Sequence, residues 1–256
     1  MERITFGAFK ALGCRAAALA FFFSIFAASP RAGAQTPAPA AAAAPAPAAS
    51  TNGVPALPPP TPEVMKKMQE ILDAYGHSKY DDALAKLAEV EKGRPNDVEL
   101  LNLRGAIYVK QQKWAEATEE FNKVLQLNPK YFPARFNLGE VPNLQKKYPE
   151  ARAIFQTLLA EDPRNELLQY KIYLTYLLEG NVTEAKTWLD KFDFTGNTPA
   201  YYYAQAAWSY SKKNVPEAES YIASAVQIFP VQSNNLFAEP LIDAGWLKRR
   251  APEAAK

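Results

Sequence analysis

The sequence predicts an all-α fold, an α-solenoid of about five stacked helix-turn-helix repeats, and three regularities indicate this fold class. Five alanines follow one another at spacings of 34, 34, 34 and 33 residues: Ala83, Ala117, Ala151, Ala185 and Ala218. An aromatic or β-branched residue lies three positions before each alanine, and an apolar residue lies four positions after it. Proline lies twelve positions after four of the five. A repeat period of this size is typical of stacked helix pairs rather than of one globular core.

The first 34 residues have the layout of a secretory signal peptide. Arg3, Lys10 and Arg15 precede the apolar run 16–28, and Ala32-Gly33-Ala34 follows as a small-residue cleavage site. The run has 13 residues, whereas a bilayer-spanning helix needs about 20. We therefore expect an exported protein of the bacterial periplasm. Secretion, and an inner-membrane anchor formed by an uncleaved segment, are the alternatives.

Residues 35–62 are a low-complexity segment of alanine and proline, with nine prolines and no charged residue. Because proline fixes φ and removes a backbone donor, this composition predicts an extended, disordered linker without a core. We interpret the linker as a spacer. A docking site for a proline-binding domain is the alternative interpretation.

The repeat domain is expected at residues 63–231. Its five copies span about 63–97, 98–131, 132–165, 166–198 and 199–231. In the second copy, Leu100, Leu103 and Ile107 recur at helical spacing, and only a tight turn at 111–113 separates them from the next helical pattern. The two helices of a copy should therefore be antiparallel neighbours.

One residue conflicts with this pattern. Pro142 falls inside the first expected helix of the third copy. Proline in a helix interior loses a hydrogen bond and clashes with the preceding turn, at a cost of about 3 kcal/mol. We therefore expect a kink, or an early end of the helix near Val141.

Several positions shared by the copies carry a family resemblance. The second copy has Leu101, Gly105, Tyr108, Ala117, Phe121 and Pro129 in register, and the third has Gly139, Tyr148, Ala151, Phe155 and Pro163. Over residues 63–231 the chain thus resembles the tetratricopeptide-repeat family. The resemblance implies a right-handed α-solenoid in which the first helix of each pair lines a concave groove that receives protein segments.

Carrying the groove-facing positions of that family onto this chain gives a set of partner-binding residues. The five that we single out are Asn102, Phe136, Tyr170, Tyr203 and Tyr210. The groove should be polar near its beginning and aromatic near its end, and tyrosine is common at binding hot spots. We expect Tyr203→Ala and Tyr210→Ala to weaken partner capture without unfolding the protein. Packing in the core is the alternative role for the tyrosine-rich stretch.

The family's clamp for C-terminal carboxylates is not reproduced. Asn137 and Lys171 fall at two suitable positions, but Asn102, Ala106 and Leu167 occupy the others. Binding of chaperone tails is therefore not predicted.

The residues needed for catalysis or metal binding are scarce. The chain has one histidine, His77, and one cysteine, Cys14, which lies in the signal peptide. Removal of residues 1–34 changes the balance from 29 basic against 27 acidic residues to 25 against 26, that is, from +2 to −1. We expect no catalytic, metal or cofactor site and no nucleic-acid partner, and contact with a membrane only if the signal segment stays uncleaved.

Residues 232–256 are expected to form a capping helix and tail. Between Asn235 and Arg250 one side is apolar, and the last repeat of a solenoid needs a cap to stay soluble. The alternative is an amphipathic helix for a partner or a membrane surface.

These observations together predict a non-enzymatic scaffold or adaptor of the bacterial cell envelope, which binds a peptide or partner segment in the concave groove. The alternative function is a carbohydrate- or small-ligand-binding protein that uses the tyrosine-rich end of the groove.

Overall fold

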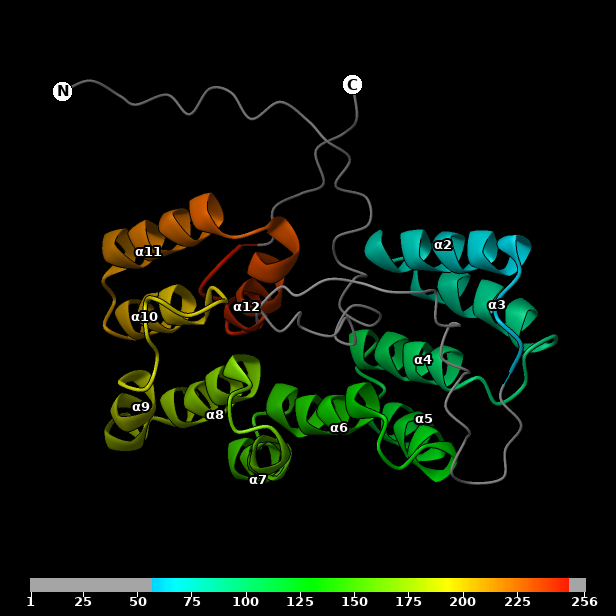
Figure 1. Ribbon diagram of the computed structural model, residues 1–256, viewed down its shortest axis with the longest axis horizontal. Coiled ribbons are helices and arrows are strands. Elements are labelled where there is room, and N and C mark those ends of the chain that lie inside the picture. The colour runs from blue at the N-terminus through cyan, green and yellow to red at the C-terminus, as the bar shows by residue number, and fades with distance from the viewer. Residues whose placement is uncertain (1–56, 249–256) are drawn as a thin grey trace, which may run out of the picture.

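The computed structural model describes residues 57–248, and all regular structure in this range is helical (Figure 1). The all-α class is confirmed. The predicted signal peptide and most of the Ala/Pro linker lie outside the described residues. Within 57–248, no helix is long and apolar enough to cross a membrane.

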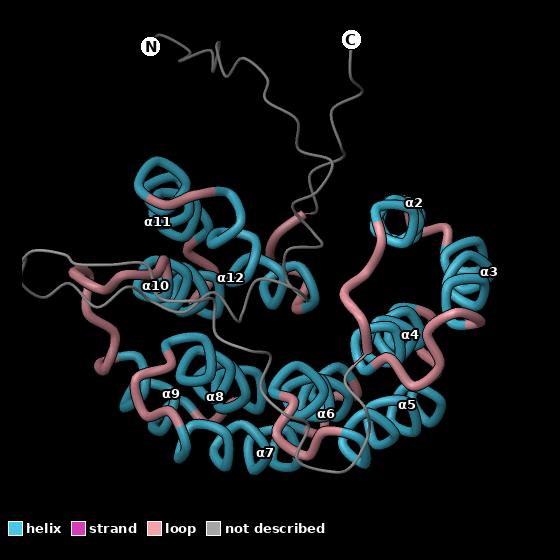
Figure 2. Tube along the Cα trace, turned by 45° about the vertical axis from the view of Figure 1, so that its right-hand side comes forward, coloured by secondary structure: helices cyan, strands magenta, loops and turns pink. Residues whose placement is uncertain are grey.

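Between residues 57 and 248, ten helices form five successive hairpins, and an eleventh follows them. The pairs are α2 (Pro62–Gly76) with α3 (Tyr80–Glu91), α4 (Val98–Lys110) with α5 (Trp114–Leu127), α6 (Phe132–Leu144) with α7 (Tyr148–Glu161), α8 (Glu166–Glu179) with α9 (Val182–Leu189), and α10 (Ala200–Ser211) with α11 (Val215–Ile228); the last helix is α12 (Val231–Asp243). The pairs follow an open arc, with α4, α6, α8 and α10 on its inner side (Figure 2). We call this inner side the concave surface.

All five hairpins use the same turn. One residue in each turn has a positive φ: Ser78, Gln112, Lys146, Gly180 and Lys213. The next residue donates its amide hydrogen to a carbonyl in the last turn of the first helix, as in the bond from the Lys113 amide to the Tyr108 carbonyl at 2.9 Å. This Schellman geometry closes helix ends. Four of the five turns use it without glycine, so the hairpin does not depend on that residue.

Glycine is required elsewhere, where two helices of a pair touch. A Cβ placed on Gly105 would lie 2.5 Å from Cε1 of Phe121, and one on Gly139 would lie 2.6 Å from Cε1 of Phe155. On the partner helix, Ala117 lies one turn before Phe121 and is completely buried. The recurrence of Gly, Ala and Phe therefore reflects the close approach of the helices.

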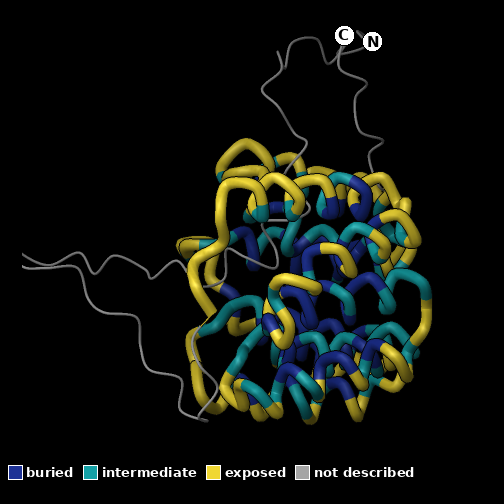
Figure 3. Tube along the Cα trace, turned by 90° about the vertical axis from the view of Figure 1, so that its right-hand side faces the viewer, coloured by how far each residue is buried: buried dark blue, intermediate teal, exposed yellow. Residues whose placement is uncertain are grey.

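The alanine ladder runs through the interior of the stack. All five of its members are completely buried. Buried positions fill the middle of the molecule, and exposed ones lie on its outer side and at the turns (Figure 3). Each alanine thus marks a place where a larger side chain would separate neighbouring helices.

Of the two outcomes expected at Pro142, the early end near Val141 was wrong, and the kink stays a prediction. Helix α6 continues past Pro142 to Leu144. The proline lies in the last turn, where its missing amide hydrogen removes one bond, and the helix still closes with a 2.8 Å bond from the Lys147 amide to the Pro142 carbonyl. A proline close to a helix end costs less than one in the middle, since few following bonds depend on it.

Candidate functional site: the concave surface and α12

The five predicted partner-binding residues lie on the inner helices, but all of them are buried. Tyr170 and Tyr203 are 0% and 1% exposed, Asn102 and Phe136 are 1% and 3% exposed, and Tyr210 is 9% exposed. Tyr170 and Tyr203 meet the same neighbour, whereas Asn102 and Phe136 belong to separate parts of the wall. Their role in binding a partner stays a prediction.

The neighbour that covers the tyrosines is α12, which lies inside the arc beside α8 and α10 (Figure 2). The Tyr170 hydroxyl donates to the backbone carbonyl of Phe237 at 3.1 Å. The Phe237 ring lies 5.3 Å from the ring of Tyr170 and 6.2 Å from that of Tyr203. Further along, Trp246 stacks on Tyr210 at 6.2 Å. The predicted capping helix therefore occupies the concave surface.

A single side chain fixes the turn that sends α12 inward. Asn234 is buried, and its amide nitrogen donates to the carbonyls of Phe229 at 2.8 Å and Pro230 at 3.1 Å. These carbonyls follow the end of α11. Val215 and Val226 on α11 remain about half exposed, at 46% and 50%. Because α12 turns inward, it leaves part of the last hairpin uncovered.

The opposite side of α12 contacts α4, in the first half of the arc. Glu239 forms a 2.9 Å ion pair with Lys110, at the end of α4, and the two residues are separated by 129 positions in sequence. Burial alone would lower the pKa of Lys110. The neighbouring Tyr75, Glu239 and Asp243 outweigh burial and raise this pKa above its ordinary value. The lysine therefore stays charged while α12 lies against it.

A second ion pair forms the floor of the concave surface. Lys171 of α8, only 4% exposed, contacts Glu140 of α6 at 2.5 Å. Burial raises the pKa of Glu140, although Lys171 opposes the shift. The free oxygen Oε1 of Glu140, and Oδ1 of Asn143 one turn further along α6, are buried and accept no hydrogen bond from any described residue.

The two clamp-like residues are both engaged within the wall. Lys171 holds Glu140, and the Asn137 amide donates to Oδ1 of Asn102 at 3.1 Å. A carboxylate that approached this surface would have to replace those partners. The carbohydrate-binding alternative meets a similar obstacle, because Tyr170 and Tyr203, its stacking platform, lie beneath α12.

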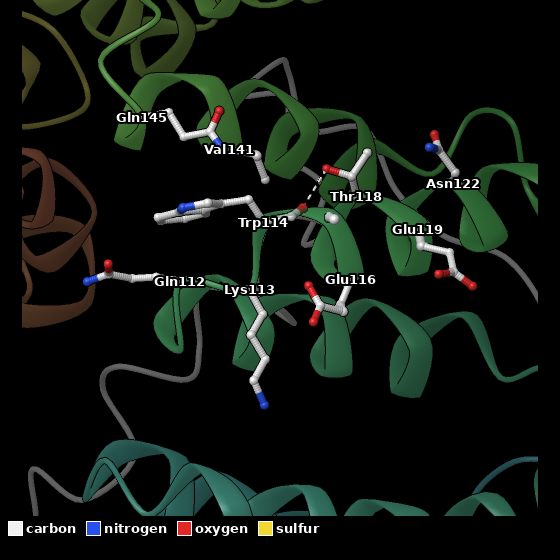
Figure 4. Close-up of a pocket in the computed structure, with 10 residues that line it drawn as sticks. Gln112, Lys113, Trp114, Glu116, Thr118, Glu119, Asn122, Val141 and Gln145 are labelled. Atoms are coloured by element: carbon white, nitrogen blue, oxygen red, sulfur yellow. Dashed lines mark hydrogen bonds between the residues drawn. The ribbon is translucent and has the colours of Figure 1, made fainter.

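A pocket lies between the start of α5 and the end of α6 (Figure 4). Trp114 lies near Val141 there, and the Thr118 hydroxyl donates to the Trp114 carbonyl at 2.8 Å. The charged side chains at its edge, Lys113, Glu116 and Glu119, point in different directions. Acid–base chemistry would require these groups to converge on a common point, and they do not.

The single histidine lies at the end of α2 and is exposed. Its Nδ1 lies 2.7 Å from the Asp73 carbonyl, so the ring is held by the backbone of its own helix. Within the described residues, no group of three or more histidine, cysteine, aspartate or glutamate side chains could hold a metal ion.

The family follows from comparison with known proteins. Models of the tetratricopeptide repeat match residues 68–132, 108–170 and 143–208, which together cover more than half of the chain. The chain belongs to the tetratricopeptide-repeat family. Tetratricopeptide repeats imply a scaffold for protein–protein interaction, and this general function is the one that the family gives to the chain.

Two curated relatives come from Arabidopsis thaliana. Hsp70-Hsp90 organizing protein 3 is 28% identical over 92 residues, and Hsp70-Hsp90 organizing protein 2 is 29% identical over 96 residues. The matches take up 36% and 38% of this chain but only 16% and 17% of those proteins. This chain thus spans about a sixth of their length, and the likeness concerns the repeats alone.

Two solved structures share the fold. A tetratricopeptide repeat protein of Parabacteroides merdae has a TM-score of 0.57 and 20% identity over 71% of each chain. A thermophilic tetratricopeptide protein of Thermus thermophilus has a TM-score of 0.54 and 20% identity, over 70% of this chain and 99% of its own. These likenesses confirm the α-solenoid.

The five residues singled out from the sequence do not include the charged members of the concave surface, Lys110, Glu140, Lys171 and Glu239, and only Lys171 was noted, as a clamp-like residue. Their residue types carry no signal, because charged side chains occur on most helices of the chain. One partial signal exists, since Glu140 stands at a groove-facing position of the third repeat. The pairing of Lys110 with Glu239 depends on the path of α12, which the repeat pattern does not specify.

Proposed function

We propose that this protein is a non-enzymatic adaptor of the bacterial cell envelope, and that it binds a peptide or helical segment of a partner protein on its concave surface. One observation carries the proposal: this surface already holds a helix, α12, through buried aromatic contacts and an ion pair. A surface shaped for one helix binds a similar segment at low ordering cost, because its own side chains are already placed.

The envelope location rests on the signal-peptide layout of residues 1–34. If this proposal is right, the chain recovered from the envelope of its host begins near Gln35, which intact-mass measurement would establish. A chain that keeps residues 1–34 would instead favour the anchored alternative.

The likeness to the Hsp70-Hsp90 organizing proteins does not extend the proposal to chaperone tails. In this chain Lys171 is committed to Glu140, and Asn137 to Asn102. The partner segment that we propose is therefore not recognised through a terminal carboxylate.

Site-specific photo-crosslinking in the native host tests the binding surface. A benzoylphenylalanine at Val109, half-buried at a groove-facing position of α4, should crosslink a partner protein. The same group at Glu119, exposed on α5, serves as the matched control. Crosslinks from Glu119 but not from Val109 would move the binding site away from the concave surface, and none from either would refute the adaptor function.

A further inference from the structure

Helix α12 presents an apolar side to the second half of the concave surface. Phe237 and Leu241 are one helical turn apart, and they are 2% and 0% exposed. Both belong to the buried cluster that contains Tyr170 and Tyr203. An aromatic residue followed four positions later by leucine is thus the part of α12 that fills this half.

The opposite side of α12 is acidic and faces the first half. Residues two positions apart lie about 200° apart around a helix, so Glu239 points away from Phe237 and towards α4, where it meets Lys110. Asp243, one turn after Glu239, acts electrostatically on the same lysine. Helix α12 therefore joins the two halves of the concave surface through two unlike faces.

The fit of α12 is incomplete. Pro240 stands inside the helix and removes one of its hydrogen bonds. Oε1 of Glu140 and Oδ1 of Asn143 are buried without a donor from the described residues. Asp243 also acts on Glu140, with a charge of the same sign. A helix that kept the favourable contacts and supplied donors here would bind better than α12 does.

Resting on the proposed function, we propose that α12 is an internal ligand, and that the partner is a helical segment with the same two-sided pattern, which binds in its place. The partner segment carries an aromatic residue and a leucine one turn apart on one side, and a carboxylate for Lys110 on the opposite side. Because α12 is part of the chain, it competes at a high effective concentration, and the affinity for an external segment is reduced by the fraction of time that α12 is docked.

A fluorescent peptide with the sequence of residues 231–248 is the probe. Added to the full chain, it should bind weakly, because α12 occupies the surface. In the Glu239→Lys variant two cations face each other and α12 is released more often, so the dissociation constant should fall by about tenfold or more. The double variant Lys110→Glu/Glu239→Lys restores the internal ion pair with reversed signs, and the carboxylate of the peptide then faces a second carboxylate, so binding should fall back to the wild-type level or below it. Equal binding by wild type and Glu239→Lys would overturn the proposal.

A second measurement covers the case in which Glu239→Lys fails to fold. With Cys14→Ser, Lys110→Cys and Glu239→Cys combined, a short bismaleimide can tie α12 to α4. The tied chain should bind the peptide at least about tenfold more weakly than the same chain without the crosslinker. If tying changes nothing, α12 is a permanent part of the fold and the proposal fails.

The crosslinking experiment at Val109 separates this failure from failure of the adaptor function. If a partner crosslinks at Val109 equally in wild type and Glu239→Lys, the adaptor function is supported, but the proposal that the partner displaces α12 is refuted. A partner whose crosslinking rises in Glu239→Lys supports both.

Discussion

The two halves of the concave surface use equivalent positions for different purposes. On α4 and α6 these positions carry Asn102 and Phe136, whereas on α8 and α10 they carry Tyr170 and Tyr203. Side chains of the first half pair within the wall, as Asn137 does with Asn102. Those of the second half pair with α12. The repeat register is the same, and only the second half depends on a helix outside the repeats.

The difference shows that aromatic residues at equivalent inner positions can be buried in two ways. A tyrosine brings on the order of 150–250 Å² of surface that must be buried somewhere. Phe136 is buried against the Phe155 ring, 5.5 Å away within its own hairpin. Tyr170 and Tyr203 are instead covered by Phe237 of α12.

The largest expected effect comes from removing an aromatic ring of the second half. Tyr203→Ala should lower the free energy of unfolding by about 3–5 kcal/mol, as buried aromatic-to-alanine changes do, because Tyr203 is 1% exposed beneath Phe237. Chemical unfolding would measure the loss. This outcome would contradict our sequence-based expectation that Tyr203→Ala leaves the fold intact.

Tyr201→Ala is the control, since Tyr201 precedes Tyr203 on α10 by two positions and is only partly buried. It should cost clearly less. If both variants unfold at the same denaturant concentration, the cover that α12 gives Tyr203 adds nothing to the stability of the protein.

The first half should respond most to a change in helix spacing. Gly105→Ala should cost about 1–3 kcal/mol, as overpacking does, because the new Cβ would lie 2.5 Å from the Phe121 ring. Gly76→Ala is the matched control, since nothing lies within 4 Å of its added Cβ. It should be neutral or slightly stabilising. If the two variants behave alike in thermal unfolding, the close approach of α4 and α5 at Gly105 does not limit the stability of the first half.

A smaller effect separates two buried tyrosine hydroxyls. Tyr170→Phe and Tyr173→Phe each remove one bond to a backbone carbonyl, that of Phe237 or that of Ala204, and should each cost about 0.5–1.5 kcal/mol. Only Tyr170→Phe cuts a bond to α12. Hydrogen exchange of the α12 amides should therefore accelerate in Tyr170→Phe alone. Equal acceleration in both variants would mean that α12 does not open separately from the repeats.

Sequence periodicity was sufficient to predict the repeats because their packing is local. The contact between Gly105 and Phe121 joins two neighbouring helices. The same contact recurs in the next repeat between Gly139 and Phe155. The position of α12 depends instead on the Asn234 turn and on the curvature accumulated over all repeats. Residues as distant as Lys110 and Glu239 then meet, and no periodic signal marks such a pair.

The smallest expected effect compares exposed ion pairs in the two parts of the chain. On α5, Lys123 pairs with Glu119, four positions before it, at 2.8 Å, and with the buried Glu120 at 3.0 Å, whereas on α9 Lys186 pairs with Asp190, four positions after it. A glutamate on the N-terminal side is the better arrangement, since it agrees with the helix dipole. Lys123→Ala should therefore lower the melting temperature more than Lys186→Ala does, and both differences should shrink at about 1 M salt.

The same pair gives a pH dependence with a definite sign. A hydrogen bond from Lys123, followed by its charge, lowers the pKa of Glu119. A carboxylate with a lowered pKa stabilises the fold above its ordinary pKa, and this contribution is lost as the pH falls through the lowered value. The difference in melting temperature between wild type and Lys123→Ala should thus be constant near neutral pH and shrink in acid. A difference that stayed the same on acidification would show that Lys123 stabilises α5 through its packing instead.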